Sequence, residues 1–135
     1  MKKNLLIGLS FALLLPTANA MAEENPALEP MQEYLDFAAF SGGAITKQQL
    51  ANFSSDDIQY IDTRQAEQFE TSHIPGAINI DWRQILTHKD QISDSKTVVL
   101  YCDTGLLSSK AQFALSVLGY ENVRVLFGGY AEWKK

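Results

Sequence analysis

The chain contains a single cysteine, Cys102, and this residue is best placed for covalent chemistry. It follows the apolar run "TVVLY" (97–101) and precedes a short polar loop that contains Gly105. A near-continuous β-branched run of this kind is typical of a strand buried on both faces of a parallel sheet. Ligands of open α/β sheets bind at the carboxyl ends of such strands. We therefore expect an accessible, reactive thiol.

The loop after Cys102 is suited to lowering the pKa of that thiol. About five residues separate the expected strand from the next helix, so the chain must curl, and its N–H groups can turn toward the sulfur as an anion-binding nest. Ser108 is expected to be the N-cap of the helix, with its hydroxyl facing the pocket. The positive end of the helix dipole points to the same place. The sequence thus predicts a nucleophilic thiolate, or a sulfur that carries an anionic group.

Other chemistries of cysteine are disfavoured. No second cysteine exists to complete a zinc site or a C-x-x-C dithiol, and His73 and His88 lack ligand spacing. His73 lies in a Pro-Gly turn, where we expect it to shape the turn rather than to act as a base. We expect neither a metal nor another cofactor.

The elements that must position Cys102 alternate between short apolar runs and helical patterns, which indicates strands joined by crossover helices. Thr46 and Gln49 form an expected capping box. The expected strands are 44–46, 58–62, 77–80, 97–101 and 123–127, and the expected helices are 47–53, 65–71, 82–86, 107–118 and a final turn through Trp133. The sequence therefore predicts an α/β fold.

The first residues predict export. Residues 1–20 combine a positive start at Lys2 and Lys3, an apolar centre and a small-residue cleavage site, as in a signal peptide. The apolar stretch is too short for a membrane anchor, which needs about 20 residues. We expect a periplasmic mature protein beginning near Met21, with a leader and an extra N-terminal helix in residues 21–43 and the main domain in residues 44–135.

The expected mature chain is acidic. Without Lys2 and Lys3, 9 basic residues stand against 16 acidic ones, so the formal charge changes from -5 to -7. Such a chain has no basic stripe with which to bind nucleic acid or anionic lipid.

Three ordered segments of the chain resemble a known family. These are "YIDTRQAEQFETSHIPGAINI", "VVLYCDTGLLSSKAQFALSVLGYENVRVL" and "GGYAEW". Together they resemble the single-domain rhodaneses, sulfurtransferases that carry sulfur as a persulfide on one cysteine, and most of all the periplasmic rhodaneses of Gram-negative bacteria. The resemblance covers roughly residues 44–135 and implies a rhodanese-like fold, with a central parallel sheet and helices on both faces.

The resemblance also implies a mechanism and a site. Cys102 would take sulfur from a donor such as thiosulfate or a persulfide and pass it to cyanide or a thiol. The persulfide donor and the thiol acceptor could each be a small molecule or be borne by a protein. Asp62 would hold backbone near the loop, and Arg64 would form a structural ion pair. Trp133 would pack on the sheet, and the glycines before it would let backbone approach the site. The residues that match the persulfide-binding loop are Cys102, Asp103, Thr104, Gly105, Leu106, Leu107 and Ser108.

The loop departs from the family in its charge. It carries Asp103 and an apolar rim of Leu106 and Leu107, and we expect Lys110 to be the cation nearest the loop. We therefore expect weak use of thiosulfate and a preference for an uncharged or protein-borne persulfide. A C-x5-R phosphatase is disfavoured, because Ser108 stands where its arginine would be. A non-catalytic rhodanese-like binding module and a cysteine redox sensor are the alternative functions.

Overall fold

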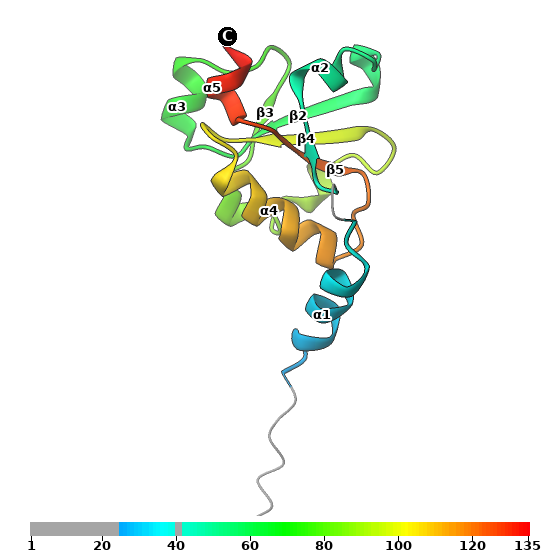
Figure 1. The fold of residues 1–135 in the computed structure, drawn as a ribbon. Helices are drawn as coiled ribbons and strands as arrows, with labels where there is room; N and C mark the ends of the chain where they lie inside the picture. The colour runs from blue at the N-terminus through cyan, green and yellow to red at the C-terminus, as the bar shows by residue number, and fades with distance from the viewer. Residues whose placement is uncertain (1–24, 40–41) are drawn as a thin grey trace, which may run out of the picture.

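The protein folds around one five-stranded parallel sheet in the computed structural model, which describes residues 25–39 and 42–135 (Figure 1). The strand order is β1-β5-β4-β2-β3, and every pairing is parallel. The predicted α/β fold with a central parallel sheet is therefore confirmed. The strands are β1 (Ala44–Ile45), β2 (Ile58–Asp62), β3 (Ile78–Asn79), β4 (Thr97–Tyr101) and β5 (Val123–Leu126).

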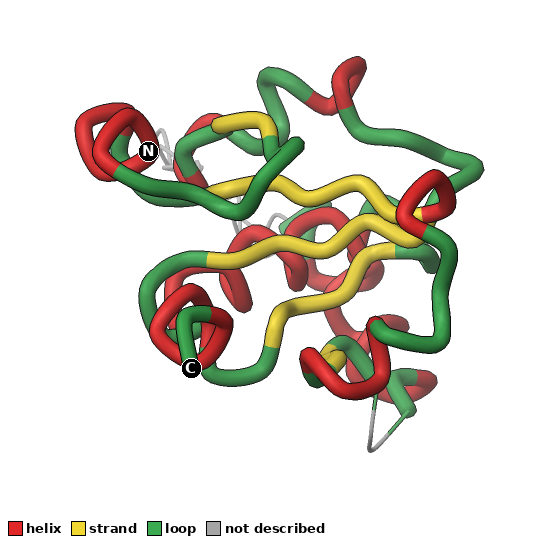
Figure 2. The backbone as a smooth tube through the Cα atoms, turned by 90° about the horizontal axis from the view of Figure 1, so that it is seen from above, coloured by secondary structure: helices red, strands yellow, loops and turns green. Residues whose placement is uncertain are grey.

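Helices cover both faces of the sheet, as predicted. Helix α4 lies on one face, and α2, α3 and α5 lie on the other (Figure 1). Viewed from above, the strands run side by side between these two helical layers (Figure 2). The helices are α1 (Leu28–Phe37), α2 (Lys47–Leu50), α3 (Ala66–Thr71), α4 (Leu106–Val117) and α5 (Gly129–Trp133), with 3-10 turns η1 (Ser55–Asp57), η2 (Trp82–Gln84) and η3 (Lys89–Gln91).

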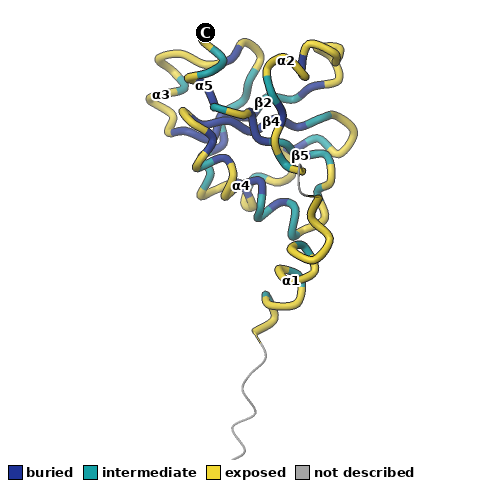
Figure 3. The backbone as a smooth tube through the Cα atoms, viewed as in Figure 1, coloured by how far each residue is buried: buried dark blue, intermediate teal, exposed yellow. Residues whose placement is uncertain are grey.

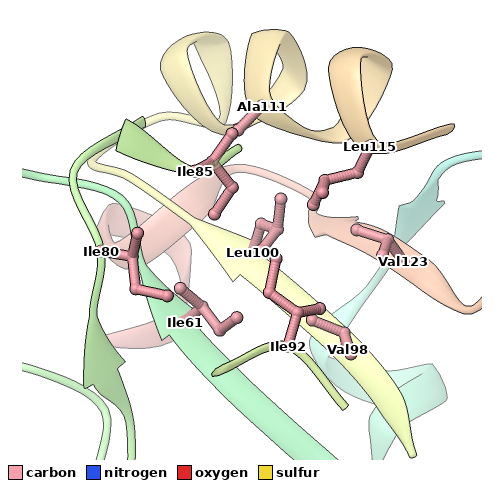
Figure 4. Packing of buried hydrophobic residues seen from close by; sticks show 9 residues of the cluster. All are labelled: Ile61, Ile80, Ile85, Ile92, Val98, Leu100, Ala111, Leu115 and Val123. Carbon is pink, nitrogen blue, oxygen red and sulfur yellow. The ribbon is translucent and has the colours of Figure 1, made fainter. Parts of the chain in front are cut away.

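The central strand β4 contributes to a core on each of its faces. Val98 and Leu100 pack with Ala111 and Leu115 of α4 (Figure 4). The intervening residues, Val99 and Tyr101, point to the opposite face and pack with Leu50 of α2 and Tyr130 of α5. Because side chains alternate along a strand, burial on both faces requires an uninterrupted apolar run. This is why "TVVLY" predicts β4 so closely.

Local signals place several element boundaries. The capping box of Thr46 and Gln49 is formed at the start of α2, and Gly119, with φ of 90°, follows the end of α4. Helix α2 is shorter than expected, because the amides of Asn52 and Phe53 bond to carbonyls three residues back and close the helix in turns. The α-helix expected at residues 82–86 is instead the 3-10 turn η2, which covers only Trp82–Gln84.

Helix α1 contacts the domain at its end rather than joining the core. It has no buried residue, and Figure 3 shows it exposed over most of its length. Its link to α4 is an edge-to-face contact between Tyr34 and Phe113, with ring centroids 5.1 Å apart. The expected signal peptide, residues 1–20, lies outside the described residues. Within residues 25–39 and 42–135, no helix is long and apolar enough to cross a membrane.

Candidate active site

The carboxyl end of β4 places Cys102 at the centre of the sheet edge. Strand β4 lies between β5 and β2. The chain leaves β2 toward β3 on one side and leaves β4 through α4 toward β5 on the other. Loops that diverge in this way create the crevice in which open α/β sheets bind ligands. The predicted position of the cysteine is therefore confirmed.

The loop after Cys102 curls around its sulfur. Only residues 102–105 separate β4 from α4, and Gly105 takes the left-handed conformation with φ of 98°. The amides of Gly105 and Leu107 donate hydrogen bonds to Cys102 Sγ at 3.2 and 3.3 Å. A residue with a side chain would be strained at this φ, so glycine lets the loop close this tightly. The predicted amide nest is present.

Ser108 contributes to the nest in a different way from the one expected. The N-cap of α4 is Gly105, so the prediction that Ser108 caps the helix is wrong. The helix starts earlier because the loop closes in four residues, which places Ser108 inside the first turn and fully buried. Its hydroxyl lies 3.0 Å from the carbonyl of Gly105 and 3.7 Å from Cys102 Sγ. The expectation that it faces the cysteine is confirmed.

These contacts lower the pKa of the Cys102 thiol. Burial alone would raise the pKa, because it disfavours the charged form. Hydrogen bonds from the Ser108 amide and hydroxyl, and from the amides of Thr104 and Leu107, outweigh burial and bring the pKa below its ordinary value. The site therefore favours the thiolate, which is the nucleophilic form of cysteine.

The thiol is not exposed as the sequence led us to expect. Cys102 has a relative exposure of 2%. The N-terminus of α5 packs directly on the backbone of the loop: a Cβ on Gly129 would lie 2.5 Å from the Cys102 carbonyl oxygen. The amides of Tyr130 and Ala131 donate to the carbonyls of Cys102 and Asp103 at 2.8 and 3.0 Å. A glycine is thus needed at residue 129, as expected from the terminal motif.

Asp62 and Arg64 form a buried ion pair beside the loop. Their exposures are 0% and 5%, and Arg64 Nη2 lies 2.6 Å from Asp62 Oδ2. Asp62 Oδ1 also accepts from the backbone amide of Arg64 at 3.0 Å. The Asp62 bond is the main reason that the pKa of Arg64 is raised above its ordinary value. The ion pair implied for Arg64 is therefore present, and the backbone that Asp62 holds is that of Arg64.

Arg64 also reaches into the cysteine loop. Its Nη1 donates to Asp103 Oδ1 at 3.1 Å, and the second oxygen of Asp103 accepts from Gln68 Nε2 at 2.9 Å. The guanidinium carbon lies 4.5 Å from the ring centroid of Tyr130. Lys110, in contrast, lies over the ring of Trp82 at 5.0 Å. The expectation that Lys110 is the cation nearest the loop is therefore wrong.

The outer side of the loop is apolar. Leu106 is 68% exposed, and Leu107 is half-buried beside the sulfur. A groove of about 530 Å³ adjoins the loop at Thr104, Gly105 and Leu106, and exposed Phe127 lies on its other side. Among the described residues that line it, none carries a charge. The predicted apolar rim is present, and Phe127 extends it.

Two residues of the surrounding motifs have the scaffold roles expected of them. His73 stacks on Phe69 with ring centroids 3.9 Å apart, and its Nδ1 lies 2.8 Å from the Phe69 carbonyl. Trp133 packs edge-to-face on Tyr60 of β2 at 5.6 Å. These rings fix the turn before β3 and the end of α5.

The sequence did not single out Gln68 or Phe127. Gln68 reaches Asp103 across 35 residues of sequence, and Phe127 borders the loop because β5 is adjacent to β4. Nothing in the pattern around Gln68 marks it. For Phe127, the one signal in the sequence is an apolar side chain at the end of the expected strand 123–127, directly before Gly128.

Comparisons with known proteins agree with this geometry. YqhL of Bacillus subtilis is 37% identical over 75 residues, which are 56% of this chain and 60% of YqhL. Thiosulfate sulfurtransferase GlpE of Coxiella burnetii is 28% identical over 78 residues, which are 58% of this chain and 73% of GlpE. The solved structure of the human single-domain sulfurtransferase TSTD1 has a TM-score of 0.55 at 26% identity, covering 67% of this chain and 94% of that chain.

The match to a family covers most of the chain and includes the whole site. Residues 46–135 match the Rhodanese-like domain, and this range contains β2, β4, the cysteine loop and α5. YqhL is matched over less than two thirds of its length. The chain belongs to the Rhodanese-like domain family.

Proposed function

We propose that the protein is a sulfurtransferase that carries a sulfane sulfur as a persulfide on Cys102. The observation that carries this proposal is the ring of N–H and O–H donors around Cys102 Sγ, formed by Gly105, Leu107 and Ser108. These donors stabilise negative charge on Sγ, both when the thiolate attacks the donor and when it is released again by the acceptor.

In the first half-reaction, the Cys102 thiolate attacks the outer sulfur of a donor. With thiosulfate, a bond forms between Sγ and the outer sulfur, the S–S bond of the donor breaks, and sulfite leaves with its electron pair. The product is a persulfide anion on Cys102, and no proton has to move. The lowered pKa of the thiol raises the fraction of the attacking thiolate at any given pH.

In the second half-reaction, an acceptor removes the outer sulfur. Cyanide attacks that sulfur, the bond to Sγ breaks, and the Cys102 thiolate returns as thiocyanate leaves. A thiolate acceptor reacts in the same way and leaves as a persulfide. The uncharged groove beside Thr104 and Leu106 supports acceptors that are uncharged outside their reacting group, including a thiol on a protein.

The names of the relatives support the same reaction class. GlpE is named a thiosulfate sulfurtransferase, and TSTD1 is named a single-domain sulfurtransferase. We carry the reaction class from these proteins to this chain. Residues 44–135 are proposed to form the transfer domain, with the segment 21–43 as an addition to it.

We also propose that the protein acts in the periplasm after removal of residues 1–20. Support comes from the charged start, apolar centre and small-residue site in the sequence. Fractionation of a Gram-negative host expressing the full chain, with the intact mass of the recovered protein, tests this. A mature chain beginning near Met21 in the periplasmic fraction is expected, and a full-length cytoplasmic protein would contradict it.

The test of the activity is thiocyanate formation from a sulfur donor and cyanide. The protein is assayed with thiosulfate and with methanethiosulfonate, beside Cys102→Ser. Serine has nearly the shape of cysteine but cannot carry the sulfur, so we expect turnover with at least one donor and none in the variant. Turnover that is unchanged in Cys102→Ser would refute the mechanism.

A further inference from the structure

Every nitrogen of the Arg64 guanidinium has at least one hydrogen-bond partner among the described residues. Its Nε and Nη2 bind Asp62, and Nη2 also donates to the Ser72 carbonyl at 2.7 Å. Nη1 donates to Asp103 at 3.1 Å. Among the described residues, Asp103 is therefore the sole hydrogen-bond partner of that nitrogen.

The Asp103 carboxylate contacts both Arg64 Nη1 and a second side chain. Gln68 donates to its second oxygen, and its backbone carbonyl accepts from Ala131 of α5. Its side chain is 57% exposed, whereas that of Arg64 is 5% exposed. Asp103 thus presents a negative charge at the surface of the loop, where a buried arginine would otherwise offer a donor.

We propose that Asp103 is a specificity-determining residue that selects against doubly charged anions at Cys102, by occupying Arg64 Nη1 and by placing a negative charge on the residue that directly follows the nucleophile. The inference deepens the proposed function, since it names the class of sulfur donor that the site favours: singly charged or uncharged sulfane sulfur compounds. The charge selection itself belongs to the cysteine pocket and can be measured apart from sulfur transfer.

The electrostatic reason is the net charge of the cluster. Asp62, Arg64 and Asp103 together carry one negative charge, and the thiolate adds another. Replacing Asp103 with asparagine makes the cluster neutral and keeps an oxygen that can accept from Arg64. Because Coulomb energy is proportional to charge, the logarithm of the gain for a dianion is about twice that for a monoanion.

The first measurement is alkylation of Cys102, the only cysteine in the chain. Iodoacetate and iodoacetamide each form a carbon–sulfur bond and release iodide, but only iodoacetate carries a charge. The ratio of their rate constants is independent of the thiolate fraction, since both consume the same thiolate. We expect Asp103→Asn to raise the iodoacetate-to-iodoacetamide ratio by about threefold or more.

Two control variants separate charge at the site from other effects. Asp57→Asn removes the same charge at the amino end of β2, five residues and roughly 16 Å along the strand from Asp62. Gln68→Met removes one contact of Asp103 without changing the charge. We expect neither to change the ratio by as much as twofold. An effect of Gln68→Met equal to that of Asp103→Asn would assign the change to loop movement and overturn the proposal.

The second measurement compares two sulfur donors. Thiosulfate is a dianion that releases sulfite, and methanethiosulfonate is a monoanion that transfers its outer sulfur in the same way and releases methanesulfinate. With Asp103→Asn we expect kcat/KM to rise about tenfold for thiosulfate and about threefold for methanethiosulfonate. A purely structural role would change both donors equally.

The two measurements fail in different ways. If Asp103→Asn leaves the alkylation ratio unchanged, or changes kcat/KM equally for both donors, the selectivity proposal is overturned while sulfur transfer stands. If the alkylation ratio rises in Asp103→Asn but neither this variant nor the unmutated protein accepts sulfur from either donor, Asp103 sets the charge preference of the thiol. The proposed sulfurtransferase function is then wrong.

Discussion

At the scale of single residues, the chemistry depends on how one sulfur is surrounded. Cys102 is buried, which disfavours a thiolate, yet the amides of Gly105 and Leu107 and the Ser108 hydroxyl all point to it. The two amide donors belong to backbone that the left-handed Gly105 turns inward. Much of the loop can therefore change its side chains without losing the nest, and Asp103 is free to set the charge preference.

The lowered pKa of Cys102 makes stability depend on pH. The folded thiol binds its proton less tightly than the unfolded thiol, so its contribution is fully present above the unfolded pKa and is lost as pH falls through the folded pKa. We expect the free energy of unfolding of the protein, relative to Cys102→Ser, to increase as pH rises toward 9.0, the ordinary pKa. Urea titrations of both proteins at a series of pH values up to 9.0 measure this difference in unfolding free energy. A difference that is independent of pH would contradict the lowered pKa.

At the scale of elements, the short helix α5 holds the cysteine loop from above. Its first amides donate to the carbonyls of Cys102 and Asp103. The approach is close because Gly129 has no side chain and takes a φ of 61°. The C-terminal "GGYAEW" segment therefore acts on the site through backbone contacts, while Tyr130 and Trp133 pack in the core on that face of the sheet.

Gly129→Ala tests this close approach. Its Cβ would lie 2.5 Å from the Cys102 carbonyl oxygen, so α5 or the loop must move, and we expect a loss of about 3 kcal/mol in unfolding free energy. Gly119→Ala is the matched control: it has a φ of 90°, but nothing lies within 4 Å of the added atom. Only backbone strain of about 1 kcal/mol is expected there. Equal losses in urea unfolding would mean that the contact with the loop contributes nothing.

Helix α1 should open independently of the domain. It has no buried residue, and its contact with α4 is made by Tyr34 on Phe113. We expect amide hydrogens in α1 to exchange at least about tenfold faster than those in α4, which packs on the sheet through Ala111 and Leu115. Hydrogen exchange followed by mass spectrometry measures this. Protection of α1 equal to that of α4 would indicate that it is part of the cooperative core.

At the scale of the whole molecule, most elements were predictable because they are set by local patterns. The run 97–101 gives β4, and Thr46 and Gln49 give the start of α2. The burial of Cys102, which is 2% exposed, was not predictable, because the local pattern of a strand followed by a polar loop indicates an accessible thiol. The ion pair of Arg64 with Asp103 was not predictable either, because the two residues are 39 positions apart. It places a buried cation beside the loop.

The measurement that tests the central claim most directly is the intact mass of the protein after exposure to a sulfur donor. The protein and Cys102→Ser are incubated with thiosulfate or methanethiosulfonate, and their intact masses are measured by mass spectrometry. Both are then treated with cyanide and measured again. The account predicts that the unmutated protein, but not Cys102→Ser, gains the mass of one sulfur atom and that cyanide removes this sulfur. No gain from either donor, or the same gain in Cys102→Ser, would contradict a persulfide carried on Cys102.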